Sequence, residues 1–116
     1  MKKSESKIQQ EIVMWFNNNY CLKSHNPKCT IFSVPNEGKN VKEQMYKRTL
    51  GMKSGVSDLI VIQPNRCIFV EVKTEIGKQS DKQKEFETTV KNLGFEYILV
   101  RSLEDFQKKI LKKVCN

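Results

Sequence analysis

The sequence has no long hydrophobic run. Its longest purely aliphatic stretch is residues 59–62, far short of the ~20 apolar residues that a membrane-spanning helix requires. The N-terminal segment is charged, and no apolar segment follows it. We therefore expect no secretory signal and an intracellular protein.

Cysteine is scarce as well. The four cysteines, Cys21, Cys29, Cys67 and Cys115, form no close pair, which predicts reduced thiols rather than a disulfide framework. Cys21, His25 and Cys29 are each four residues apart, a spacing that metal ligands can have. A fourth ligand at a suitable spacing is missing, so we do not favour a metal site there.

Glycine and proline are too few to build a linker or a low-complexity tract, with 5 and 3 of them in 116 residues. The sequence also shows no internal repeat. We therefore expect one domain that spans residues 1–116.

Acidic residues are outnumbered, since 21 Lys and Arg face 13 Asp and Glu, for a formal charge of +8. Such a balance favours a polyanionic partner, although a merely solvated, lysine-rich surface would give the same count. Residues 36–55 form a basic segment, with five Lys and Arg against Glu37 and Glu43. We interpret the following residues there as DNA-binding: Lys39, Lys42, Lys47, Arg48 and Lys53.

Hydrophobic periodicity and capping residues predict four helices and four strands. The helices are expected at about 4–19, near 41–50, at 80–93, and from Ser102 onward with Leu103, Phe106, Ile110 and Val114 inward. The strands are expected at 30–34, 58–62, 67–73 and 95–100, the middle two as a hairpin buried on both faces. Because a helix separates the last two strands, this order implies a mixed sheet flanked by helices, an α/β sandwich.

Three charged residues fall where a buried hairpin is expected. Asp58 opens one strand, and Glu71 and Lys73 lie at i and i+2 of the next, so their side chains leave the same face of the sheet while Val72 points the other way. Unpaired charges would be costly to bury there. One reading is an ion pair between Glu71 and Lys73 on a solvent-facing edge, with Asp58 as a turn residue.

The other reading is a metal site. Two converging carboxylates suit Mg²⁺ or Mn²⁺, which prefer oxygen ligands and also contact phosphate. The backbone carbonyl of Val72 is a candidate third ligand. Lys73 would then lie near a bound water and stabilise the charge that develops during phosphodiester hydrolysis.

Two further polar residues have two readings each. Glu5 lies near the packed face of the first helix, either as a partner of the helix dipole or as a member of the same metal cluster. Gln83 follows Ser80 by three residues, which is a capping-box signature, and it also lies near the sheet-facing stripe of its helix.

Taken in their order along the chain, the residues named above resemble the pattern of the PD-(D/E)xK nuclease superfamily. More narrowly, the sequence resembles a stand-alone VRR-NUC domain of the kind found in phages and other viruses. The resemblance covers nearly the whole chain and rests on short matching segments. These are Ser4 to Gln9, Val34 to Gly38, Gly55 to Asp58, Glu71 to Lys73, Ser80 to Gln83, and Leu93 to Phe95. Ser57 departs from the proline that the family commonly has before the aspartate, which affects rigidity rather than ligand chemistry.

The resemblance implies a restriction-endonuclease-like α-β-β-β-α-β core with an added C-terminal helix, and a DNA endonuclease dependent on Mg²⁺ or Mn²⁺. Asp58, Glu71 and the Val72 carbonyl would bind the metal. Glu5 would complete the site or position a water, Lys73 would act on the nucleophile, and Gln83 would orient Lys73 or the phosphate.

The resemblance also implies a homodimer, and branched DNA such as flaps or four-way (Holliday) junctions as substrate. The competing hypotheses are a catalytically inactive nucleic-acid-binding module on the same fold and a basic structural protein that prefers RNA.

Overall fold

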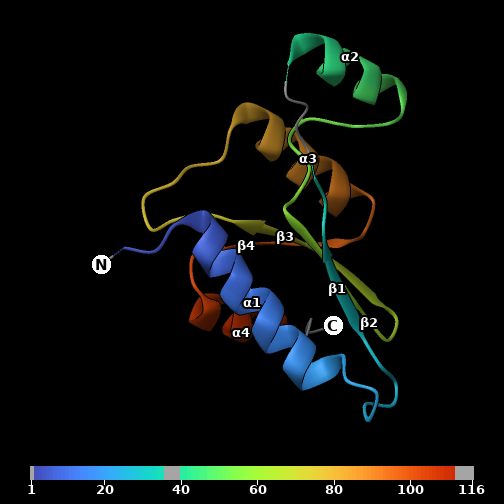
Figure 1. Ribbon diagram of the computed structural model, residues 1–116, viewed down its shortest axis with the longest axis vertical. Helices are drawn as coiled ribbons and strands as arrows, with labels where there is room; N and C mark the ends of the chain where they lie inside the picture. The colour runs from blue at the N-terminus through green and yellow to red at the C-terminus, as the bar shows by residue number, and fades with distance from the viewer. Residues whose placement is uncertain (1, 36–39, 112–116) are drawn as a thin grey trace.

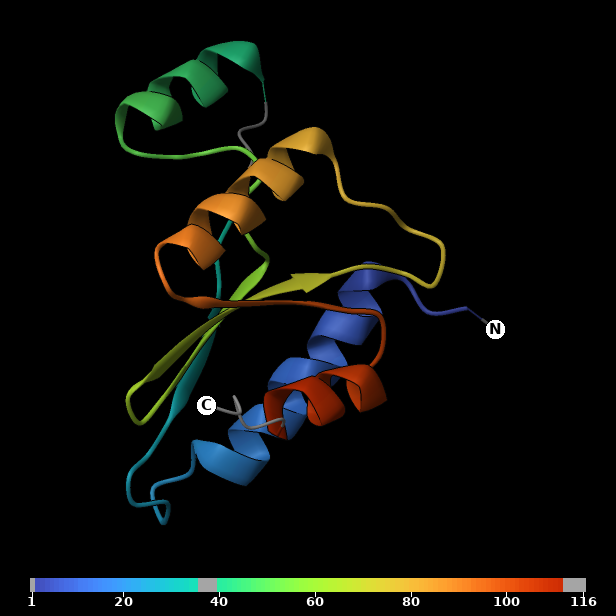
Figure 2. The same ribbon diagram turned by 180° about the vertical axis from the view of Figure 1, so that it is seen from behind.

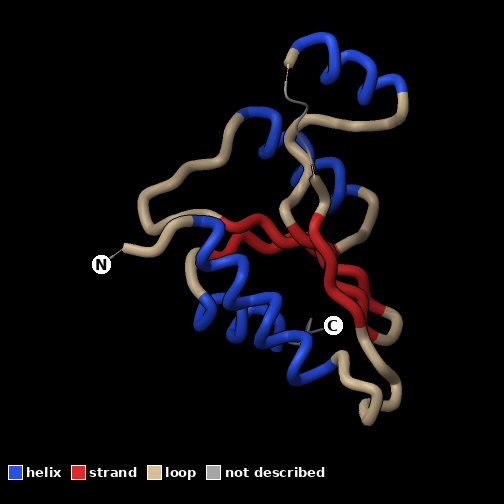
Figure 3. Tube along the Cα trace, in the orientation of Figure 1, coloured by secondary structure: helices blue, strands red, loops and turns tan. Residues whose placement is uncertain are grey.

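The computed structural model describes residues 2–35 and 40–111. Its elements along the chain are α1 (Glu5–Tyr20), β1 (Thr30–Ser33), α2 (Val41–Thr49), β2 (Leu59–Gln63), β3 (Arg66–Val72), α3 (Asp81–Asn92), β4 (Glu96–Val100) and α4 (Leu103–Leu111) (Figures 1 and 3). Several residues named above lie outside the described ranges: Asn36, Gly38, Lys39, Val114 and Cys115. No helix within the described ranges is long and apolar enough to cross a membrane.

The four strands form one mixed sheet in the order β1-β2-β3-β4. β2 runs antiparallel to both β1 and β3, and β4 lies parallel to β3. A parallel pair needs a crossover connection, and α3 provides it between β3 and β4. The predicted α/β fold with a mixed sheet and flanking helices is confirmed.

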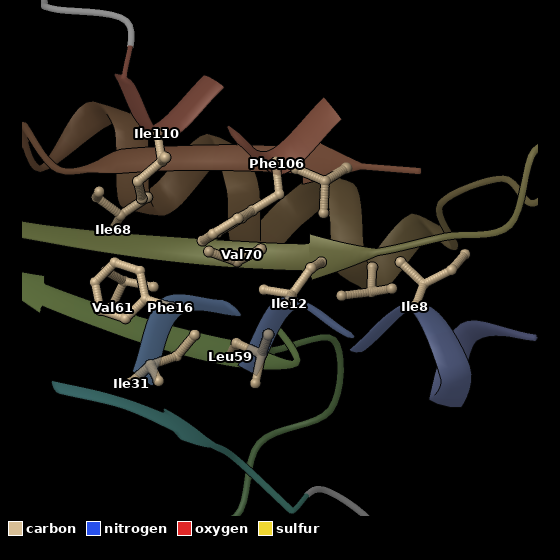
Figure 4. Packing of buried hydrophobic residues seen from close by; sticks show 12 residues of the cluster. Ile8, Ile12, Phe16, Ile31, Leu59, Val61, Ile68, Val70, Phe106 and Ile110 are labelled. Atoms are coloured by element: carbon tan, nitrogen blue, oxygen red, sulfur yellow. The ribbon is translucent and has the colours of Figure 1, made fainter. Parts of the chain in front are cut away.

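The helices cover the two faces of the sheet unequally. Helices α1 and α4 pack together on one face, whereas α3 lies across the other (Figures 1 and 2). The buried apolar core fills the space between the sheet and the α1/α4 layer (Figure 4). The prediction of a hairpin buried on both faces is therefore only half right, because Ile62 of β2 remains 42% exposed.

The apolar spacing of α1 produces this layer. Ser4 caps the helix by accepting a hydrogen bond from the backbone N–H of Lys7 (3.1 Å). Ile8, Ile12 and Phe16 then recur on one face and are buried. Edge-to-face contact between Phe16 and Phe106 of α4, with ring centroids 6.2 Å apart, joins the two helices.

Helix α2 differs from the other helices because, among the residues that the structure describes, it packs against no other helix or strand. Asn40 caps it by accepting from the backbone N–H of Glu43 (2.8 Å). None of its side chains is buried, and it projects beyond α3 at one end of the molecule (Figure 1). Lys42, Lys47 and Arg48 are thus presented on a protruding helix.

The segment that returns from α2 to the sheet passes very close to α3. Gly55 has a φ of +84°, and a Cβ at this position would lie 2.5 Å from the backbone carbonyl carbon and oxygen of Lys82. Only glycine fits both the left-handed conformation and the close approach. This contact fixes the start of α3 against the residues that lead into Asp58.

Gly55→Ala should therefore destabilise the protein by about 2–4 kcal/mol, the sum of backbone strain and a clash that neither backbone can avoid. Gly51→Ala is the matched control, because Gly51 also has a positive φ (+101°) but has nothing within 4 Å of a Cβ. Its cost should be only about 1–2 kcal/mol of strain. Chemical denaturation measures both values, and equal losses would contradict the close-contact explanation.

Candidate active site

Asp58 sits where the chain enters β2. Its backbone carbonyl accepts from Val34 N–H (3.0 Å), and its side-chain Oδ2 accepts from Val72 N–H (2.7 Å). The aspartate is therefore tied to the end of β3. The preceding Ser57 is buried, and its hydroxyl donates to the carbonyl of Leu59 (3.3 Å), a local bond that restrains the position where the family commonly has proline.

Glu71 and Lys73 lie on the opposite side of β3 from the main core. Phe69, two residues before Glu71, lies on the same side of β3. Its ring packs edge-to-face on Phe86 of α3, with ring centroids 5.6 Å apart, so this side faces α3. Glu71 is 0% exposed and Lys73 is 8% exposed. Lys73 Nζ lies 3.7 Å from Glu71 Oε2, so the ammonium group and the carboxyl group are neighbours in a buried environment. They are not a solvent-facing edge pair.

Two further side chains donate to the Glu71 carboxylate. Gln83 Nε2 of α3 lies 3.0 Å from Oε2, and the Tyr97 hydroxyl of β4 lies 3.4 Å from Oε1. Both carboxylate oxygens therefore have donors. Groups from β3, α3 and β4 meet at this one side chain, beside Asp58 at the entrance to β2.

The two readings of Gln83 turn out to be compatible. Its Oε1 accepts from Ser80 N–H (2.9 Å), and Ser80 Oγ accepts from Gln83 N–H (3.2 Å), which completes a capping box. Because the amide oxygen is used by the cap, the amide nitrogen points at Glu71. The cap therefore determines that the amide nitrogen of Gln83, and not its oxygen, faces the Glu71 carboxylate.

Burial raises the pKa of the Glu71 carboxyl from 4.5 to about 8. Charge repulsion from the neighbouring Asp58 and a hydrogen bond with it contribute to this rise, while Lys73 and Tyr97 oppose it. Desolvation has the larger influence because no solvent reaches the side chain. A cation bound at this carboxyl would remove the cost of its negative charge beside Asp58.

Glu5 is placed differently from the expectation. Its side chain is exposed at the first turn of α1, so the prediction that it faces inward is wrong. Within residues 2–35 and 40–111, no three His, Cys, Asp or Glu side chains group closely enough to hold a metal. The structure therefore brings Asp58 and Glu71 together but does not add Glu5 to them.

Cys21, His25 and Cys29 lie in the connection between α1 and β1. His25 Nδ1 accepts from Leu22 N–H (2.8 Å), and Cys29 N–H donates to the Tyr20 carbonyl (2.9 Å). These bonds close the connection.

The basic residues in the described part of the segment have different surroundings. Lys42, Arg48 and Lys53 are exposed. Lys47 is half-buried and pairs with Glu43 (3.0 Å). Because α2 packs against none of the other described helices and strands, these residues form a surface on and beside α2.

Tyr97 was not recognised from the sequence. It is 6% exposed, and its hydroxyl accepts from Gln79 Nε2 (3.1 Å), which also donates to Glu87 Oε1 (3.1 Å). Burial and the charge of Glu71 raise the pKa of Tyr97 above its usual range, so the hydroxyl keeps its proton. A tyrosine in a strand gives no signal by itself, because only the β3/β4 register puts Tyr97 opposite Phe69 and near Glu71.

The raised pKa of Glu71 makes a prediction for the metal-free protein. Because the folded state holds this proton more tightly than the unfolded state does, stability should fall as pH rises from about 4.5 to about 8. One such group contributes at most about 1.4 kcal/mol per pH unit. Glu71→Gln should remove this slope in denaturation curves recorded with EDTA.

Glu75→Gln changes an exposed carboxyl in the next loop and should keep the wild-type slope. An unchanged slope in Glu71→Gln would mean that Glu71 is ionised throughout the range.

Comparisons with known proteins agree with this fold. The sequence matches the VRR-NUC domain over residues 3–114. A solved structure described as a VRR_NUC domain protein superimposes with a TM-score of 0.76, at 17% identity, over 95% of this chain and 87% of the other. No curated protein matches the sequence. The solved structure supports the fold, and since the family match covers nearly every residue, the chain belongs to the VRR-NUC domain family.

Proposed function

We propose that this protein is a metal-dependent endodeoxyribonuclease that hydrolyses phosphodiester bonds. The observation that carries the proposal is the cluster of Asp58, Glu71 and Lys73, two carboxyl groups and an amine at the ends of adjacent strands, of which Glu71 and Lys73 are buried. A nuclease of the VRR-NUC family needs such a set to bind a divalent cation and stabilise an anionic transition state.

The residues at the site fit Mg²⁺ or Mn²⁺. Asp58 and Glu71 supply hard oxygen ligands, and Glu71 sits where its negative charge is otherwise disfavoured. The Val72 N–H points to Asp58, and since the N–H and C=O of one strand residue face the same neighbour, the Val72 carbonyl is a candidate third ligand. When bound, the cation would polarise the phosphate and favour ionisation of the attacking water.

The remaining residues act around these ligands. Lys73 would stabilise the charge that develops on the phosphate, since its ammonium is held beside Glu71 with little access to solvent. Gln83 would keep the Glu71 carboxylate oriented through its 3.0 Å bond. The exposed Glu5 would reach the site only by way of a water or the substrate, and its role stays a prediction.

Lys73→Ala should abolish cleavage, a loss of at least about 100-fold, while DNA binding is largely retained. The assay uses labelled linear, flap and four-way-junction DNA with Mg²⁺, Mn²⁺ or EDTA, which also ranks the substrates. Lys78→Ala, an exposed lysine in the following loop, is the control and should cleave normally. Equal cleavage by Lys73→Ala would remove Lys73 from the mechanism.

An inactive binding module would keep the fold and use the Glu71 and Lys73 pair only as a buried ion pair. Calorimetric titration with Mn²⁺ separates the two functions. A nuclease site should bind Mn²⁺, lose this binding in Asp58→Asn, and release protons at pH 7 as Glu71 ionises. Absence of binding in the wild type would favour the module, and a preference for RNA in competition would favour a basic structural protein.

Branched DNA as substrate and a homodimer as the assembly are parts of the same proposal. The basic surface of Lys42, Lys47, Arg48 and Lys53 would track phosphates along the DNA backbone. A dimer would cover an exposed part of the molecule such as β1, which lies at the edge of the sheet. Light scattering at micromolar concentrations tests the dimer.

The double variant Lys47→Ala, Arg48→Ala should weaken DNA binding regardless of sequence. Loss of two phosphate contacts should reduce the slope of log affinity against log salt by about 1.8. Lys23→Ala, Lys28→Ala removes the same charge from the loop between α1 and β1, at the end of the molecule opposite α2 (Figure 1). This control should keep the wild-type slope, and an unchanged slope in the α2 variant would exclude α2 from the DNA interface.

A further inference from the structure

A chain of polar side chains extends from the Glu71 carboxylate to the outer side of α3. It consists of Tyr97 on β4, Gln79 in the loop before α3, and Glu87 on α3. The Tyr97 ring packs in the interior, but its hydroxyl adds nothing to that packing. A buried hydroxyl that contacts a buried carboxylate calls for an explanation in terms of that carboxylate.

The direction of each hydrogen bond in this chain is fixed. Glu87 is paired with Lys91 (2.6 Å) and accepts from Gln79 Nε2 (3.1 Å). The nitrogen of the Gln79 amide, and not its oxygen, therefore faces Glu87. That nitrogen can only donate, so the Tyr97 hydroxyl accepts from it (3.1 Å). The hydroxyl has one hydrogen of its own, and the remaining partner is Glu71 Oε1 at 3.4 Å.

The two oxygens of Glu71 are thus held by donors whose own orientation is set elsewhere. Gln83 is oriented by the cap of α3, and Tyr97 is oriented by Gln79 and Glu87. The Tyr97 ring is itself packed against Phe86, with ring centroids 6.3 Å apart. The carboxylate therefore cannot rotate without breaking a bond on one side.

We propose that Tyr97, oriented by Gln79, is a positioning residue that holds the Glu71 carboxylate in the orientation required to bind a divalent cation. The inference rests on the proposed function and adds to it a residue outside the Asp58, Glu71 and Lys73 set. Hydrogen bonds to a ligating carboxylate preorganise it, so their loss weakens metal affinity without removing a ligand.

Tyr97→Phe tests the inference because it removes the hydroxyl and keeps the packed ring. With Mn²⁺ as the probe in calorimetry of the full chain, Kd should rise about tenfold. In cleavage assays the Mn²⁺ concentration for half-maximal rate should rise in parallel, while the rate at saturating Mn²⁺ changes much less. A merely structural hydroxyl would lower the melting temperature and leave the Mn²⁺ affinity of the folded protein unchanged.

Two further variants complete the experiment. Tyr20→Phe is the matched control, because Tyr20 lies in the aromatic cluster of α1 and should leave Mn²⁺ affinity unchanged. Gln79→Ala keeps the Tyr97 hydroxyl but frees its direction, so Kd should rise less than in Tyr97→Phe. If Tyr97→Phe does not fold, Gln79→Ala decides the question.

The two possible failures are distinguishable. Wild-type Mn²⁺ affinity in Tyr97→Phe, or in Gln79→Ala where Tyr97→Phe does not fold, would overturn the positioning role and leave the proposed nuclease intact. A wild-type protein that binds no Mn²⁺ would overturn both.

Discussion

The buried carboxylate of Glu71 is the constraint around which one side of this molecule is organised. A carboxylate with no exposed surface is costly unless donors or a cation compensate it. Here the donors come from three elements: Lys73 on β3, Gln83 on α3 and Tyr97 on β4. Because these interactions all end on Glu71, they connect the crossover helix α3 to β3 and β4, the strands before and after it in the chain. The same convergence makes the position suitable for a metal-dependent reaction.

The two faces of the sheet carry different kinds of side chains. The α1/α4 face is filled with aliphatic and aromatic side chains, and alternate residues of β3 such as Val70 and Val72 point into it. The α3 face receives the residues between them, which include Glu71. Because the backbone of β3 is fixed by the apolar side, the polar residues on the other side are presented with little freedom.

Helix α2 is attached to the rest of the described structure differently. It is connected to the sheet through its flanking segments and packs against no other described helix or strand. Its return segment is nevertheless anchored, because Gly55 lies against the backbone of Lys82 at the start of α3. This contact holds the segment that follows α2 beside the first turn of α3, which contains Gln83.

The sequence by itself determined the elements, the Asp58, Glu71 and Lys73 pattern, and the Ser80 and Gln83 cap, because strand alternation, helix periodicity and capping are local properties. It did not reveal that Glu5 is exposed, since a helical wheel gives the face of a residue but not where the packed layer ends. Nor did it reveal Tyr97, because the parallel register of β3 and β4 depends on how α3 crosses the sheet. Contacts between residues 26 positions apart, such as Glu71 and Tyr97, are decided only when the whole sheet has formed.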